Sequence, residues 1–136
     1  GVPTGLEPLS RSLRLQDRAA ARNFDWPDVN GALEKLHEEV GELERELSLL
    51  SAAGTADAAL EDRLEDEIGD LLFAAVNVAR LAGIHPSTAL ERAAGKFSDR
   101  FRSLLTLAAE RGIDPDDSDL ETLDLLWEEV KRSAGS

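Results

Sequence analysis

Apolar residues recur along this chain at alternating intervals of three and four positions, the spacing that places them on one side of an α-helix. The clearest run lies within 30–53 and consists of Leu33, Leu36, Val40, Leu43, Leu47 and Leu50. A run of this kind indicates a helix that packs along a nearly parallel neighbour. No segment of the sequence shows the alternating β-branched pattern of a strand, so the pattern predicts an all-α fold.

Breaks in the pattern divide the chain into about five helices. We expect the first over about 6–22, with Leu6, Leu9, Leu13 and Ala20 as its apolar side, and the second over 30–53. A connection at 51–57 leads into a third long helix that closes at Gly83, and this helix should lie antiparallel to the second. Its apolar side is expected to be Leu60, Leu64, Ile68, Leu71, Leu72, Ala75 and Ala79.

The last two helices are marked by their ends. Pro86 opens the fourth helix, since proline at the first helical position loses no needed hydrogen bond, and Gly112 ends it. Its buried side is expected to be Leu90, Ala94, Phe97, Phe101, Leu104 and Ala108. After a loop at 114–117, Ser118 and Glu121 have the spacing of a capping box and begin a short fifth helix. At 136 residues the whole chain, 1–136, fits one domain.

The loop at 23–28 combines turn-forming residues with two of the few aromatic side chains, Phe24 and Trp26. Large aromatic residues are an unusual choice for a simple connection. The composition therefore predicts a loop that is packed against the fold or faces a ligand.

The formal charge of −13, from 28 acidic residues against 15 Lys and Arg, argues against a nucleic acid or an anionic membrane as partner. A small phosphorylated substrate would also be repelled unless cations neutralised the acids. The absence of cysteine excludes disulfides and thiolate metal sites and suits a cytoplasmic protein. The most apolar stretch is too short to span a membrane. The chain begins at Gly1 without an initiator Met, so we expect either a trimmed chain or a part of a longer protein.

Two groups of acids lie on the two central helices: Glu38, Glu39 and Glu42 on one, and Glu67 and Asp70 on the other. Residues three or four apart share a helix face, so antiparallel packing could set these groups opposite each other. The alternative is that they are ordinary solvated acids in a chain that has many.

Three features favour a shared site. Glu34, Glu38, Glu42 and Glu46 form an acidic column whose repulsion a cation would offset. Glu39 borders the apolar side of its helix, and glycines at 41 and 69 inside the acid groups suggest close backbone approach. Oxygen ligands without cysteine point to Mg²⁺ or Mn²⁺ rather than zinc.

With these acids the sequence resembles the MazG family, whose mark is EExxE on one helix and ExxD on the next. The likeness extends to Phe24-Asp25-Trp26, to the runs 69–74, 77–80 and 96–101, and to Leu120-Glu121-Thr122, Trp127 and Lys131. It is greatest to the C-terminal, catalytic half of two-domain MazG proteins. Together these segments cover nearly the whole chain.

The resemblance implies an enzyme that hydrolyses a nucleoside triphosphate between the α and β phosphorus atoms, giving a monophosphate and pyrophosphate. It implies a helical bundle whose core is completed by dimerisation, as a homodimer or a dimer of dimers. Metal ligands would be Glu39, Glu42, Glu67 and Asp70, with Glu38 in the same cluster. Glu38 or Glu39 would act on the attacking water, and the sequence does not decide between them.

The resemblance also names substrate contacts. Lys96 and Arg100 correspond to phosphate-binding cations, assisted by Lys131, Lys35 and Arg63, although each could be an ordinary surface charge. Trp127 would stack near the nucleotide or belong to the core. Asn77, a polar residue on the buried third helix, is either a contact for sugar or base or a structural asparagine.

Two rival functions remain to be weighed. A di-iron carboxylate bundle needs two Glu-x-x-His motifs, and only Glu34 and His37 provide one, so we reject it. A non-enzymatic module that self-associates through the second helix, with solvated acidic faces, stays as the alternative.

Overall fold

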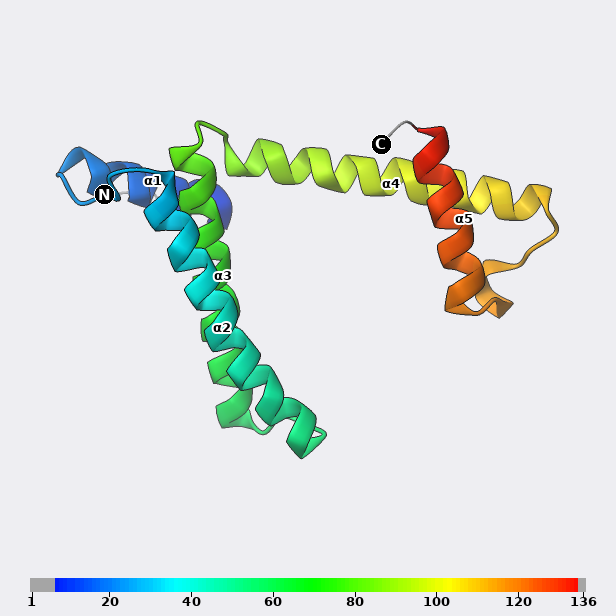
Figure 1. The fold of residues 1–136 in the computed structure, drawn as a ribbon, viewed down its shortest axis with the longest axis horizontal. Helices are drawn as coiled ribbons and strands as arrows, with labels where there is room; N and C mark the ends of the chain where they lie inside the picture. Colours follow the sequence, from blue (N-terminus) through cyan, green and yellow to red (C-terminus); the bar gives the residue numbers. More distant parts are fainter. Residues whose placement is uncertain (1–6, 135–136) are drawn as a thin grey trace. The chain divides into compact units, whose positions relative to one another are not determined.

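The computed structural model describes residues 7–134, and all regular structure in that range is helical (Figure 1). Five α-helices and one short 3₁₀ helix follow one another along the chain, which confirms the all-α prediction. They are α1 (Pro8–Ala21), α2 (Val29–Ala53), α3 (Ala58–Leu81), α4 (Pro86–Glu110), the 3₁₀ helix η1 (Pro115–Asp117) and α5 (Leu120–Ser133). Their ends agree with the sequence-based limits to within about two residues; Leu6, expected in the first helix, lies outside the described residues.

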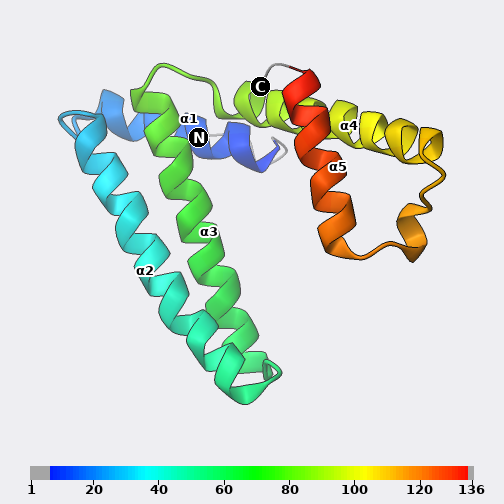
Figure 2. The same ribbon diagram turned by 45° about the vertical axis from the view of Figure 1, so that its right-hand side comes forward.

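The helices α2 and α3 form an antiparallel hairpin and lie side by side along most of their lengths (Figure 2). The side chain of Asp28 caps the start of α2 by accepting from the backbone of Asn30, and Asp57 caps α3 by accepting from Leu60. Gly54 ends α2 with φ +81°, a conformation that residues with a side chain rarely adopt. A short connection with a fixed cap at each end therefore sets the register of the hairpin.

The first helix packs against α3, and a side chain joins the two. Gln16 of α1 is buried, and its Nε2 donates to the backbone carbonyl of Phe73 on α3 at 2.9 Å. The backbone groups within a helix are already paired, so this is an additional bond to a carbonyl of an intact helix. It fixes α1 on α3.

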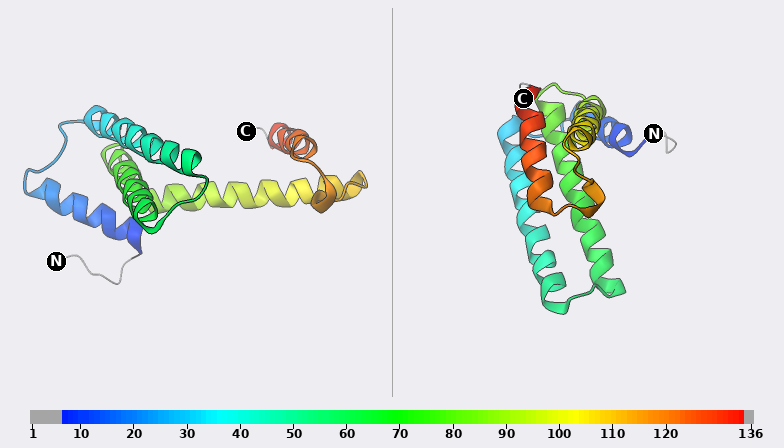
Figure 3. Two further views of the ribbon diagram at one scale, coloured as in Figure 1. Left: turned by 90° about the horizontal axis from the view of Figure 1, so that it is seen from below. Right: turned by 90° about the vertical axis from the view of Figure 1, so that its right-hand side faces the viewer.

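The chain divides into two compact units, residues 1–88 and 89–136, and each is described here by itself. In the second unit α5 packs across the C-terminal half of α4 (Figure 3). The core of this unit consists of Leu104, Ala108, Leu126 and Val130. Arg111, just after α4, reinforces it with two hydrogen bonds of 2.6 Å to the carboxylate of Glu129 on α5.

The fifth helix begins one residue later than the capping box predicted. Its N-cap is Asp119, whose side chain accepts from the backbone N–H of Thr122 at 2.9 Å. Ser118 instead donates to the carbonyl of Asp114 and ends the 3₁₀ helix, which occupies the segment expected to be a loop. The capping box of Ser118 with Glu121 was therefore wrong, because the adjacent aspartate is an equally good cap.

The expected buried side of α4 is also wrong over much of its length. Leu104 and Ala108 are buried as predicted, but Leu90, Phe97 and Phe101 are between 46% and 60% exposed. Ala94 is exposed as well. Periodicity correctly identified one apolar side, and within the second unit α5 covers only its C-terminal part.

The apolar run of α2 is divided in the same way. Leu36, Leu43 and Leu50 are partly buried, whereas the alternate positions Leu33, Val40 and Leu47 stay about 40% exposed. The packing of α3 therefore uses only half of the run.

Among the described residues no helix by itself has the length and apolar character of a membrane span, although α3 and α4 taken together pass that test by length and composition alone.

Candidate functional site

Three carboxylates from the two helices of the hairpin come together in the first unit. Glu39 of α2 and Glu67 and Asp70 of α3 each place an oxygen within 4.8 Å of the others. Glu67 and Asp70 share a face of α3 because they are three residues apart, and antiparallel packing sets Glu39 opposite them. This is the arrangement that the sequence predicted for the two acid groups.

Glu39 is almost fully buried, with 4% of its surface exposed. Its Oε1 forms an ion pair with Nζ of Lys35, which lies one turn earlier on α2, at a distance of 3.0 Å. Its Oε2 is buried and has no hydrogen-bond partner among the described residues. The hydrogen bond to Glu39 raises the pKa of Lys35, which keeps the lysine charged beside the cluster.

The surroundings of Glu67 in the cluster raise the pKa of its carboxyl group. Desolvation by burial raises the pKa of its carboxyl most, and the neighbouring carboxylate of Glu42 raises it further, followed by Glu39 and Asp70. Its Oε2 is also buried without a partner in residues 7–134. Glu42 therefore interacts electrostatically with Glu67, although it is not one of the three carboxylates that meet, and its role as a metal ligand stays a prediction.

A divalent cation fits these residues. In the described part of the chain two buried carboxylate oxygens lack hydrogen-bond partners, and several partly desolvated carboxylates repel one another, so a bound cation would relieve both costs. The donors are all oxygen atoms, which suits Mg²⁺ or Mn²⁺ and not a metal that prefers sulfur.

Glu38 does not join the three carboxylates. Its side chain is 61% exposed, and its closest described cation is Lys35, at 3.8 Å. The two adjacent glutamates thus differ: Glu39 points into the hairpin and Glu38 toward solvent.

The sequence suggested that the glycines inside the acid groups mark close backbone approach. The structure shows that they do not. A Cβ at Gly41 would lie 3.9 Å from the nearest atom, on Arg45, and one at Gly69 would meet nothing within 4 Å. Gly31 leaves no room for a side chain, because a Cβ there would come within 2.8 Å of the indole of Trp26.

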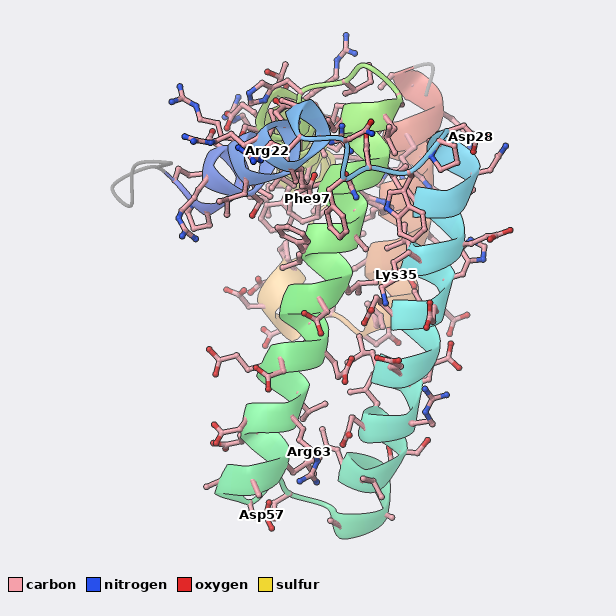
Figure 4. All side chains as sticks on the ribbon, turned by 90° about the vertical axis from the view of Figure 1, so that its left-hand side faces the viewer. Arg22, Asp28, Lys35, Asp57, Arg63 and Phe97 are labelled. Atoms are coloured by element: carbon pink, nitrogen blue, oxygen red, sulfur yellow. The ribbon has the colours of Figure 1, made fainter. Side chains whose placement is uncertain are left out.

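Two predicted substrate contacts of the first unit have partners within the chain. Arg63 donates to Glu46 of α2 at 3.1 Å and lies nearer the loop end of the hairpin than Lys35; both project between the helices (Figure 4). Asn77 is partly buried and accepts two hydrogen bonds from Arg80, one turn later on α3.

The loop 23–28, which the sequence predicted to be packed or ligand-facing, meets residues that sequence reasoning did not connect with it. Arg80 pairs with Asp25 of this loop, and a cavity of 390 Å³ next to the pair is lined by residues of α1, the loop and α3. Gln16 lines it as well. One signal was available: Gln16 falls between Leu13 and Ala20 at the spacing of the apolar side of α1, where a polar residue needs a reason.

Comparison with known proteins assigns the family. The family model described as "MazG nucleotide pyrophosphohydrolase domain" matches residues 29–104. The chain belongs to the MazG family. The match runs from the start of α2 into α4, so it contains the five acids and leaves out the loop 23–28, Trp127 and Lys131.

The chain is also similar to two curated relatives. It is 38% identical over 131 residues to the nucleoside triphosphate pyrophosphohydrolase of Escherichia coli K12, covering 96% of this chain and 47% of that protein. It is 36% identical over 123 residues to the nucleoside triphosphate pyrophosphohydrolase/pyrophosphatase MazG of Thermotoga maritima, covering 90% of this chain and 44% of that protein. This MazG chain thus spans about half the length of these two relatives.

The remaining predicted contacts of this MazG chain lie in the second unit. Lys96 is exposed, and Arg100 is partly buried. Trp127 packs on Phe97 with ring centroids 5.5 Å apart, and Lys131 pairs with Glu128 at 3.2 Å. Trp127 also packs against the core of this unit, which supports its structural role.

Proposed function

We propose that this chain is a divalent-metal-dependent nucleoside triphosphate pyrophosphohydrolase, which cleaves between the α and β phosphorus atoms and releases a monophosphate and pyrophosphate. The observation that carries the proposal is the meeting of Glu39, Glu67 and Asp70, where one buried oxygen of Glu39 and one of Glu67 have no hydrogen-bond partner among residues 7–134. Membership of the MazG family and the names of the two relatives support the reaction type.

Glu39, Glu42, Glu67 and Asp70 would hold Mg²⁺ or Mn²⁺. When bound, such an ion neutralises phosphate charge and makes water at the site more acidic. The protein's own part is to hold the substrate and the water in line and to accept a proton.

The exposure of Glu38 suggests how the two adjacent glutamates divide the work. Glu39 is buried within the cluster, whereas Glu38 keeps an accessible carboxylate beside it. We assign Glu39 to the metal and Glu38 to the attacking water. As the water oxygen bonds to the α-phosphorus, the bond from that phosphorus to the bridging oxygen breaks, pyrophosphate leaves, and Glu38 takes the proton.

The cations named by the resemblance are proposed phosphate contacts. Lys35 adjoins the acid cluster and is held there by Glu39. The resemblance alone supports the other proposed contacts, which are Arg63, Lys96, Arg100 and Lys131 for the phosphates and Trp127 near the nucleotide.

We also propose that the protein works as a homodimer or a dimer of dimers in the cytoplasm. The exposed half of the α2 run, Leu33, Val40 and Leu47, is continuous along one side of the helix. Ile68 and Leu72 of α3 are exposed as well, at 44% and 54%. Such apolar rows typically mark a protein interface, and a second copy would complete the core. A cytoplasmic site agrees with a nucleotide substrate and with the absence of cysteine.

The test is to incubate the purified chain with Mg²⁺ and a mixture of ribo- and deoxynucleoside triphosphates and to identify the products. We expect pyrophosphate and monophosphates, and no reaction when EDTA replaces the metal. Orthophosphate with a nucleoside diphosphate would show that the cleavage site is wrong. No product with any triphosphate would favour the self-association module instead.

A further inference from the structure

The row of charged side chains that contains the acid cluster continues toward the loop end of the hairpin. It has three members on each helix, which are Glu39, Glu42 and Glu46 on α2 and Asp70, Glu67 and Arg63 on α3. Steps of three and four residues separate the members on both helices, so each set shares one helix face. Because the helices are antiparallel, the steps match, and the side chains follow one another as three facing pairs.

The third pair differs from the other two because one partner is a cation. Arg63 lies one turn before Glu67 on α3, a rise of roughly 6 Å. It is the one cation in this row of six, and Figure 4 shows it between the two helices toward the loop. A positive charge therefore stands directly beside the acids that are proposed to hold the metal.

Glu46 holds Arg63 by a single nitrogen. The Nε of Arg63 donates to Oε2 of Glu46 at 3.1 Å, and neither Nη1 nor Nη2 donates to a residue in the described part of the chain. Arg111 differs, because both of its terminal nitrogens donate to Glu129. The fork of N–H groups with which an arginine binds phosphate is therefore unused on Arg63 within the described chain.

The two partners also differ in exposure. The side chain of Glu46 is 19% exposed, whereas that of Arg63 is 49% exposed. The more enclosed carboxylate thus restrains the arginine and leaves the guanidinium accessible. Restraint of a long side chain before a ligand arrives reduces the entropy cost of binding.

The charge of Glu46 by itself would oppose phosphate binding. The chain already carries a formal charge of −13, and one more acid beside the site adds to the repulsion of a triphosphate. Any help that Glu46 gives must therefore act through Arg63. This gives a positioning role a sign opposite to that of simple electrostatics.

We propose that Glu46 is a positioning residue that holds Arg63 as a contact for the pyrophosphate part of the substrate. The proposal rests on the proposed function, in which a metal at the acids holds the triphosphate. It assigns the leaving pyrophosphate to the side of the cluster that faces the loop of the hairpin. One helical turn separates Arg63 from Glu67, a spacing comparable with the length of that group.

The experiment measures the binding of inorganic pyrophosphate at saturating Mg²⁺ by isothermal titration calorimetry, which requires no turnover. The proteins are the wild type, Glu46→Gln, Arg63→Gln and the variant with both changes. The control is Glu44→Gln, which removes the same charge from an exposed position of α2. Circular dichroism of each protein checks that the helices are retained.

We expect Glu46→Gln to weaken pyrophosphate binding about three- to tenfold, roughly the net effect of one hydrogen bond, although a repelling charge is removed. Arg63→Gln should weaken it about tenfold or more, because a charged donor is lost. The double variant should bind as Arg63→Gln does, since Glu46 acts only through the arginine. Glu44→Gln should bind as the wild type does or slightly more tightly.

Binding that is unchanged or tighter in Glu46→Gln would overturn the proposal, because electrostatics alone predicts that direction. Additive losses in the double variant would also overturn it, and so would a wild type that binds no pyrophosphate. Failure of the proposed function gives a different result. A wild type that binds pyrophosphate but hydrolyses no triphosphate contradicts the reaction, and the binding data then still decide the role of Glu46.

Discussion

The Nζ of Lys35 lies 3.0 Å from Oε1 of Glu39, one turn away on the same face of α2. This contact places the most buried carboxylate of the acid cluster next to a cation supplied by its own helix. The other oxygen of Glu39 has no hydrogen-bond partner in the described part of the chain, so only one of the two carboxylate oxygens is paired. Lys35 therefore partly replaces the cation that the cluster is suited to bind.

Replacing Lys35 tests this relationship. Lys35→Met should destabilise the metal-free protein by about 1–3 kcal/mol, because a buried carboxylate then loses its partner. Saturating Mg²⁺ should reduce the loss, since the metal would supply the missing positive charge. Urea unfolding in EDTA and in Mg²⁺ measures both values; an identical loss in the two conditions would contradict a shared role.

Removing a charge from the cluster should have opposite effects on stability and activity. Glu67→Gln should abolish pyrophosphate release, lowering kcat by about 100-fold or more, because a metal ligand is lost. It should leave the metal-free protein as stable as the wild type or more stable, because burial and Glu42 disfavour its charge. Activity assays and thermal unfolding in EDTA check this, with Glu65→Gln, an exposed acid on the same helix, as control.

The pair of Asp25 and Arg80 predicts a dependence on pH. The hydrogen bonds from Arg80 hold the pKa of Asp25 below its usual value, so its folded form prefers the ionised carboxylate. Its contribution to stability is then complete above the ordinary aspartate pKa of about 4 and declines as the pH falls through the lower, folded value. The difference in unfolding free energy between wild type and Asp25→Asn should be constant from pH 7 to about pH 5 and shrink below pH 4. A difference that grows in acid would contradict the ion pair.

A methyl group at Gly31 should disturb the aromatic loop. Its Cβ would come within 2.8 Å of Trp26, so Gly31→Ala must displace the indole. We expect a shift in tryptophan fluorescence, because Trp26 must leave its position over residue 31. Gly95→Ala on α4 is the matched control, since a Cβ there meets nothing within 4 Å. That control should be neutral or stabilise by about 0.5–1 kcal/mol through helix propensity.

A charge on the exposed half of the α2 run should disrupt the proposed dimer. Leu47→Asp should convert the associated protein to monomer in analytical ultracentrifugation, because the charge would be buried without a partner. Arg45→Glu, at an exposed polar position of the same helix, should leave association unchanged. A monomeric wild type would rule out the dimer at once.

The sequence predicted the helices and the acid cluster because both follow from helical geometry. The position of Glu39 beside the apolar run implied its burial, and the spacing of Glu67 and Asp70 implied a shared face; the structure confirms both. The start of α5 was missed by one residue, since Ser118 and Asp119 cap equally well and only tertiary packing decides between them.

The errors on α4 and at the loop have another cause. Periodicity shows which side of a helix is apolar but not what covers it, so Phe97 and Phe101 were expected to be buried. The pair of Asp25 and Arg80 joins residues far apart in sequence, and a single sequence contains no signal of such a contact. Gln16 could have been noticed, because it interrupts the apolar side of α1.

The acid cluster lies entirely on two consecutive helices joined by a short connection, which bears on how the protein is made. Contacts between neighbours in sequence form quickly, so the hairpin can assemble on the ribosome before α4 and α5 have been synthesised. The nascent chain would then meet the repulsion among Glu39, Glu67 and Asp70 early, and a divalent cation that neutralises these acids would ease its folding.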